Sequence, residues 1–133
     1  MQVIIFENSH GGVSVCTPTG DLPIEQVLVK DCPEGAIIVN ENILPKDDDF
    51  FNAWELNNNV VSVNLEKSKE ITKTRLRAER EPLLQAQDVA FQRALETGAN
   101  TTAIVVEKQR LRDITKLADS ANSLEELRLI KVK

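Results

Sequence analysis

The hydrophobic pattern of the chain changes its period at Leu65, and this change limits the folds that the chain can adopt. Before Leu65, short apolar runs at 3–6 and 36–39 alternate with segments rich in Gly, Pro, Asn and Asp. Such runs are typical of strands joined by turns. After Leu65, apolar residues recur at the three- and four-residue spacing of amphipathic helices. The sequence therefore predicts an α+β protein, with an antiparallel β-rich domain at 1–64 and a helical hairpin domain at 65–133.

The first domain is predicted to hold a small antiparallel sheet and one short helix. Its expected strands are residues 3–6, 13–16, 36–40, 53–57 and 60–64. Asn58 and Asn59 separate the last two strands, and Asn tolerates the left-handed backbone of a two-residue hairpin turn. Asp21 is expected to cap the short helix, with Pro23 in its first turn. A loop through Pro45 is expected between the third and fourth strands.

The second domain is predicted to hold two antiparallel helices and a short terminal helix. Asn64 is suited to cap a long helix that ends at Gly98, and Pro82 within it predicts a kink. The residues expected on its buried stripe are Leu65, Thr72, Leu76, Leu83, Ala86, Ala90 and Ala94. A second helix is expected at about 102–118, and Ser123-Leu124-Glu125-Glu126 is a capping box for the last one. A two-helix hairpin buries only part of its stripe unaided, so a homo-oligomer, a dimer or a trimer of dimers, is expected.

Charge and cysteine content narrow the class of protein. Residues 1–64 carry two basic and ten acidic side chains, residues 65–133 carry fourteen basic and eleven acidic ones, and the net charge is -5. Because the basic groups are interleaved with acidic ones, nucleic-acid binding is not expected. No apolar run approaches the ~20 residues that cross a bilayer, and no secretory signal is seen, so a cytoplasmic protein is expected. Cys16 and Cys32 are then expected to be reduced thiols, with a disulfide or redox role as the alternative.

The sequence has no strong catalytic or metal-binding signature. His10 is the only histidine, and it lies in a Gly-flanked loop without a companion motif. Gly11-Gly12 lacks the lysine of a phosphate loop, and the acidic run 47–49 lacks the spaced ligands and terminal glutamate of a calcium loop. Carboxylate pairs for acid–base chemistry stay open, because the chain holds 21 acidic residues. We therefore expect a binding protein without catalytic residues, metal or cofactor.

Three of the five aromatic residues lie within residues 50–54, directly after the acidic run. The rings of Phe50, Phe51 and Trp54 are suited to stack a nucleobase, and the amide of Asn52 is suited to bind its polar edge. The alternative is that Phe50 and Trp54 anchor the sheet against the helices.

Rows of basic residues flank the apolar stripes of both long helices. The rows are Lys69, Lys73, Arg77 and Arg80 on the first helix and Lys108, Arg112 and Lys116 on the second. Guanidinium groups bind phosphate oxygens well, so the candidates for holding the phosphates of a ligand are Arg77, Arg80, Arg110 and Arg112. The alternative is a solvated flank of ion pairs with neighbouring glutamates.

The order of motifs along the chain resembles that of small proteins encoded by tailed phages. These motifs are Gly-Gly-Val-Ser-Val at 11–15, Pro18, Pro-Ile-Glu at 23–25, Leu44-Pro45, Phe-x-Asn-Ala-Trp at 50–54, Leu-Arg-Ala-Glu-Arg at 76–80 and Lys-Gln-Arg-Leu-Arg-Asp at 108–113. Among phage proteins, the sequence is similar to the first Thoeris anti-defence family. Members of that family sequester the cyclic ADP-ribose isomers made by bacterial TIR-domain enzymes, and some hold cyclic oligonucleotides. Asp49 and Phe51 stand where the family pattern has arginines.

This resemblance implies a non-enzymatic sponge in the host cytoplasm that binds a nucleotide-derived signal and assembles into a multimer. Under it, Phe50, Phe51, Asn52 and Trp54 would contact base or ribose, and the four candidate arginines would hold phosphates. Two alternatives stay open. One is a structural or accessory component of a phage particle, associated with the tail, in which the hairpin is an assembly surface. The other is a small inhibitor of a host defence enzyme.

Overall fold

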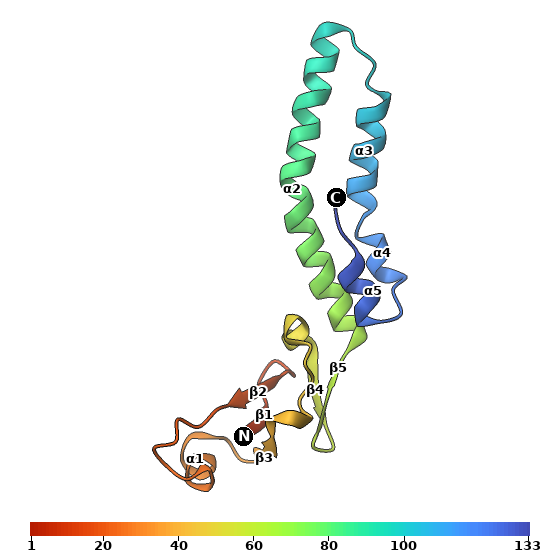
Figure 1. Cartoon of the computed structure of the whole chain (residues 1–133). Coiled ribbons are helices and arrows are strands. Elements are labelled where there is room, and N and C mark those ends of the chain that lie inside the picture. The colour runs from red at the N-terminus through yellow and green to blue at the C-terminus, as the bar shows by residue number, and fades with distance from the viewer. The chain divides into compact units, whose positions relative to one another are not determined.

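The computed structural model describes residues 1–133 and confirms the α+β class, with 54% of residues in helices and 17% in strands. The chain divides into two compact units, Met1–Lys67 and Ser68–Lys133 (Figure 1). The first unit, called here the sheet unit, holds all the strands, and the second, called the helical unit, holds most of the long helix and all that follows it. The boundary between the units falls inside the first turn of that helix.

A three-stranded antiparallel sheet is the centre of the sheet unit. Its strands are β1 (Gln2–Glu7), β2 (Val13–Cys16) and β3 (Ile37–Asn40), in the order β2-β1-β3. Central strand β1 places Ile4 opposite Cys16 on one side and opposite Ile38 on the other. Because directly opposite residues point to the same face, these three side chains share one face of the sheet. Helix α1 (Ile24–Asp31) joins β2 to β3 and contacts β1 and β3.

The other face of this sheet packs against a hairpin of β4 (Trp54–Asn57) and β5 (Val60–Val63). Its core consists of the buried residues Val3, Ile5, Val13, Trp54 and Val61. Asn58 and Asn59 have φ of 51° and 64°, so the predicted left-handed turn is confirmed.

Two local predictions in the sheet unit were wrong. Asp21 does not cap α1, because Pro23 occupies the cap position without a side-chain bond, and Asp21 instead accepts a hydrogen bond of 3.0 Å from Thr19 Oγ1. The expected loop after β3 contains two 3₁₀ helices, η1 (Glu41–Ile43) and η2 (Asp48–Ala53). A short 3₁₀ helix needs only hydrogen bonds between residues three apart. It is too short to produce a hydrophobic period in the sequence that would predict it.

The long helix α2 (Leu65–Thr97) begins and ends where its sequence signals predict. The Asn64 side chain accepts a hydrogen bond of 3.0 Å from the backbone N–H of Lys67, and Gly98 follows the last turn with a φ of 71°. Pro82 lies within the helix, which continues through it. α3 (Thr102–Asp113) runs beside α2 (Figure 1). None of the helices is both long and apolar enough to cross a membrane.

After α3 the chain forms α4 (Lys116–Asp119) and α5 (Leu124–Leu129), so the single helix expected at 102–118 is interrupted by a turn at 114–115. The capping box is confirmed in part, since Ser123 Oγ accepts a hydrogen bond from Glu126 N, while the Glu126 carboxylate accepts one from the backbone N–H of Asn122.

The core of the helical unit lies at one end of the α2–α3 hairpin. Leu76, Leu111, Ile114 and Val132 are buried together there, with Leu83, Leu84 and Ile130 packed against them. Beyond this region only Ala94 of α2 is buried, and Ala86, predicted on the buried stripe, is exposed. In the outer half α2 faces one helix, α3, whereas several segments pack against α2 at the base. One helix covers a narrower arc of the α2 surface, which explains why Ala86 is exposed.

Candidate functional site

The predicted aromatic cluster belongs to η2 and the start of β4, and its members have different environments. Trp54 is buried, and its indole Nε1–H donates a hydrogen bond of 3.2 Å to the Asp47 carbonyl oxygen. Phe50 is also buried. Phe51 keeps 38% of its surface exposed, and its ring centroid lies 4.8 Å from that of Trp54 at an interplanar angle of 59°. Of the three rings, Phe51 is therefore the one that a ligand can reach.

A cavity of about 280 Å³ lies where η2 meets the loop between β1 and β2. Its lining residues are Asn8, His10, Gly12, Val13, Phe51 and Asn52. It thus joins two predicted ligand-binding residues, Phe51 and Asn52, to the lone histidine. No sequence pattern links residues 8–12 to residues 51–52, so His10 could not be placed here from the sequence.

Asn8 gives this loop its shape. Its Oδ1 accepts hydrogen bonds of 3.0 Å from the backbone N–H groups of His10 and Gly12, and its own N–H donates to the Gly12 carbonyl at 2.9 Å. Gly11 has a φ of 78°, a left-handed value that favours glycine. A Cβ on Gly12 would lie 3.2 Å from Asn8 Nδ2. The Asn8 side chain therefore holds the loop, and His10 is exposed at the cavity.

The chemistry of the cavity suits a flat and weakly charged group. Phe51 offers a ring, Asn52 an amide and His10 an imidazole, while neither Lys nor Arg lines the cavity. A ring and polar groups can hold a heterocycle by stacking and hydrogen bonding. The lining contains no fixed positive charge that would hold a phosphate.

All four predicted phosphate-binding arginines lie in the helical unit, and two of them bind backbone carbonyls there. Arg80 Nη1 donates to the carbonyls of Leu111, at 3.3 Å, and of Arg112, at 2.9 Å, near the end of α3. The last carbonyls of a helix have no partner within it and carry the negative end of its dipole, so a guanidinium group stabilises them.

Arg110 also serves the fold of the helical unit. It donates to the Val132 carbonyl at 2.8 Å and pairs with Glu107 at 2.6 Å. The hydrogen bond from Arg110 lowers the pKa of the Glu107 carboxyl. The two remaining candidates, Arg77 and Arg112, are exposed, and their guanidinium groups form no hydrogen bond or ion pair.

Sequence reasoning missed Arg75, which binds the terminal segment of the chain. Its Nη2 donates to the carbonyls of Leu127, at 3.3 Å, and Ile130, at 2.9 Å, and its Nη1 pairs with Glu79 at 3.2 Å. The Arg-rich segment 75–80 was the only signal in the sequence. It does not distinguish an arginine that binds a carbonyl from one that faces solvent.

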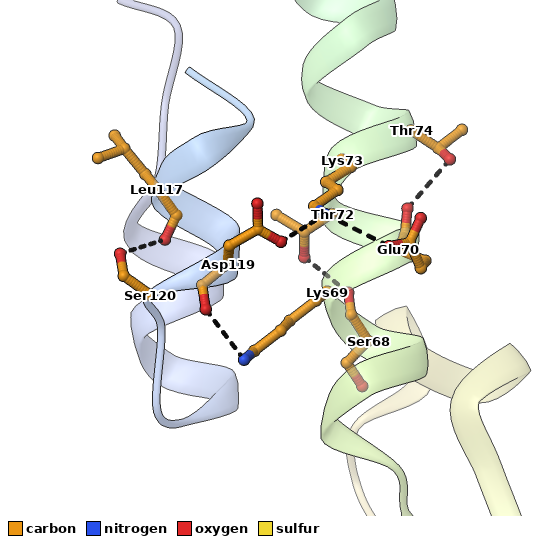
Figure 2. A network of polar contacts seen from close by, with 9 residues as sticks. All are labelled: Ser68, Lys69, Glu70, Thr72, Lys73, Thr74, Leu117, Asp119 and Ser120. Atoms are coloured by element: carbon orange, nitrogen blue, oxygen red, sulfur yellow. Dashed lines mark hydrogen bonds and ion pairs between the residues drawn. The ribbon is translucent and has the colours of Figure 1, made fainter. Parts of the chain in front are cut away.

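The basic row of α2 is occupied in the same way at its first two positions (Figure 2). Lys69 Nζ donates to the Asp119 carbonyl at 3.2 Å, and Lys73 Nζ pairs with the Asp119 carboxylate at 2.5 Å. The bond to Asp119 raises the pKa of Lys73. This network fixes α4 against α2, which the sequence did not predict. Lys73 also pairs with Glu70 at 3.4 Å, so the alternative interpretation of the row, a flank of ion pairs with neighbouring glutamates, is confirmed at this position.

The outer half of the α2–α3 hairpin exposes aliphatic side chains that point in more than one direction. Lys108 lies over the Phe91 ring, 5.2 Å from its centroid, and pairs with Asp88 at 2.6 Å. These contacts between α2 and α3 mark one face of the hairpin. By helical spacing, Leu95 and Val105, exposed by 61% and 49%, lie toward that face. Val89 and Val106, exposed by 50% and 64%, lie on the sides of α2 and α3 that point away from the facing helix. We call these four residues the outer aliphatic surface.

In comparisons with protein-family models, curated proteins and solved structures, no significant match to the chain was found.

Proposed function

We propose that the protein acts by binding other proteins, as an accessory or structural component of a phage particle, and that the outer half of the α2–α3 hairpin is its assembly surface. The observation that carries this proposal is the outer aliphatic surface, Val89, Leu95, Val105 and Val106, each about half exposed or more. Removing such groups from water is favourable, at roughly 25 cal/mol per Å² of apolar surface.

The distribution of these residues in more than one direction around the hairpin favours an assembly of more than two chains. One isologous dimer contact covers a single patch on each subunit. Aliphatic side chains that point in different directions from a two-helix hairpin need packing partners on more than one side, as in a multi-subunit particle. The base of the hairpin is already covered by α4, α5 and the terminal segment, which leaves the outer half for partners.

A photo-crosslinking amino acid tests this proposal in phage-infected cells. It replaces Val105, then Val106, which points away from α2, and then Gln92, an exposed polar residue of α2, as the matched control. We expect adducts with subunits of the phage particle, or with further copies of this chain, at positions 105 and 106 and none at 92. Equal labelling at all three positions, or no protein adduct at any, would refute the assembly role.

The cavity at Phe51 supports a second candidate function, the sequestration of a nucleotide-derived signal such as a cyclic ADP-ribose isomer. About 280 Å³ is near the lower end of the usual range of ligand pockets, roughly 300–1,000 Å³, so it suits one heterocycle. Stacking on Phe51 would contribute roughly 1–3 kcal/mol. The phosphates would then be held outside the cavity lining, which contains neither Lys nor Arg.

A thermal-shift panel of cyclic ADP-ribose isomers and cyclic oligonucleotides tests the second function. A ligand at 100 times its dissociation constant adds about 2.7 kcal/mol to the apparent stability. Phe51→Ala should abolish the shift, while Phe91→Ala, a matched loss of one ring in the helical unit, should not. A panel without any shift would leave assembly as the only candidate. Ligand recovered in cleaved form would refute sequestration and identify an enzyme.

A further inference from the structure

The two cysteines of the chain lie close to each other near the end of helix α1, although the sequence separates them. Cys16 is the last residue of β2 and lies opposite Ile4 in the sheet. It therefore shares a face with Ile4, which is fully buried, and this is the face that does not carry the β4–β5 hairpin core. α1 contacts the sheet and buries Val27.

Cys32 stands where α1 ends, with an extended backbone (φ -114°, ψ 150°) that leads the chain away from the helix. Asp31, the residue before it, lines one cavity together with Cys16, so the two cysteines lie close to each other. Both residues are half-buried and neither is in a disulfide. Desolvation by burial, then the contact with Cys16, raise the pKa of the Cys32 thiol, so this group is protonated at neutral pH in the reduced protein.

A cavity of about 300 Å³ opens beside Cys16. All of its lining residues belong to the segment 16–31 that connects the two cysteines. It admits a small thiol or disulfide to the Cys16 sulfur, which a fully buried cysteine would not allow. The pair is thus both close together and open to a small reagent.

We propose that Cys16 and Cys32 are a dithiol site that closes reversibly into a disulfide by exchange with a low-molecular-weight disulfide. The Cys16 thiolate attacks one sulfur of the reagent and releases one reagent thiol, which leaves a mixed disulfide at Cys16. The Cys32 sulfur, after losing its proton to solvent, then attacks the Cys16 sulfur and releases the second reagent thiol. The two cysteines are oxidised by two electrons, and the reagent disulfide is reduced to two thiols.

The bond would change the sheet unit at an element with few buried side chains. Val27 is the only buried residue of α1, while Val29 is 84% exposed, so few side chains hold this helix. A link between positions 16 and 32 would close the segment 17–31 into a loop and restrict it in the open state as well. In the reduced protein the same segment is expected to open locally at low cost.

The full chain treated with oxidised glutathione tests this site. Trypsin cuts after Lys30, so Cys16 and Cys32 fall in different peptides that only a disulfide joins. In the parent protein we expect this linked pair, an intact mass lower by two hydrogens, and full reversal by dithiothreitol. Cys16→Ser and Cys32→Ser should each instead accumulate a glutathione adduct on the remaining cysteine, because the second thiol is missing.

Hydrogen exchange gives a second readout on the same samples. Amides of α1 should exchange about tenfold more slowly, or slower still, in the oxidised protein than in the reduced one. The proposal fails if the parent protein stays reduced, accumulates glutathione adducts as the variants do, or forms its disulfide between two chains. It also fails if the internal bond forms and α1 exchange does not change.

Discussion

Arg75→Ala is the sharpest test of how the helical unit is held together. Arg75 joins α2 to the end of α5, because its Nη2 donates to the carbonyls of Leu127 and Ile130. The substitution keeps a good helix former at a partly exposed position and removes the two carbonyl bonds and the pair with Glu79. Its effect on stability therefore reports on these contacts.

The magnitude follows from the number of bonds and their exposure. Hydrogen bonds to charged groups contribute about 1.5–3 kcal/mol each, and an exposed ion pair contributes about 0.3–0.5 kcal/mol. The Arg75 side chain is 38% exposed, so water replaces part of what is lost. We expect a total destabilisation of about 1–2 kcal/mol. For a unit of this size, Tm falls by about 4–8 °C per kcal/mol, which predicts a decrease of about 4–16 °C.

Thermal unfolding followed by circular dichroism at 222 nm measures this decrease, because helices dominate that signal. Arg77→Ala is the matched control, since Arg77 is an exposed arginine of the same helix without a bonded partner. It should change the stability by at most about 0.5 kcal/mol. Glu79→Ala separates the ion pair from the carbonyl bonds and should cost about 0.3–0.5 kcal/mol. Equal melting of the Arg75 and Arg77 variants would refute the carbonyl clamp.

Three further outcomes are expected. Trp54→Ala should destabilise the sheet unit by about 3–5 kcal/mol and Phe51→Ala by less than half of that, measured by urea unfolding, and equal losses would contradict their different burial. The bonds from Asn64 and Lys67 lower the pKa of Glu55, so its contribution to stability is present above the unfolded pKa and is lost as pH falls through the folded pKa. Glu55→Gln should therefore flatten the acid side of the stability curve, and parallel curves would show that the contact does not persist in solution. Light scattering should give at least twice 14.8 kDa, Val106→Glu should reduce that mass, and a monomeric parent would refute self-association.

Much of the secondary structure could be predicted because its signals are local. Asn64 caps α2 through a residue three positions later, and Asn58 and Asn59 adopt left-handed backbone within their own turn. The 3₁₀ helix η2 and the turn that separates α3 from α4 were missed. Neither has a hydrophobic period long enough to detect, so packing against other segments decides them.

The residues of the candidate site could be predicted by type and not by role. An aromatic cluster at 50–54 is visible in the sequence, but only packing buries Phe50 and Trp54 and leaves Phe51 at the cavity beside His10. Arg77 and Arg80 look equivalent in the sequence, and only the position of the α3 end beside Arg80 separates them.

By itself, the sequence determined where most of the strands and the long helix begin and end, since caps, turns and hydrophobic periods act within a few residues. Tertiary structure alone decided which side chains meet across the chain, including Cys16 with Cys32 and Arg75 with the terminal segment. The physical reason is that a charged or thiol group finds its partner by position in space. That position depends on how whole elements pack, and no spacing along the chain encodes it.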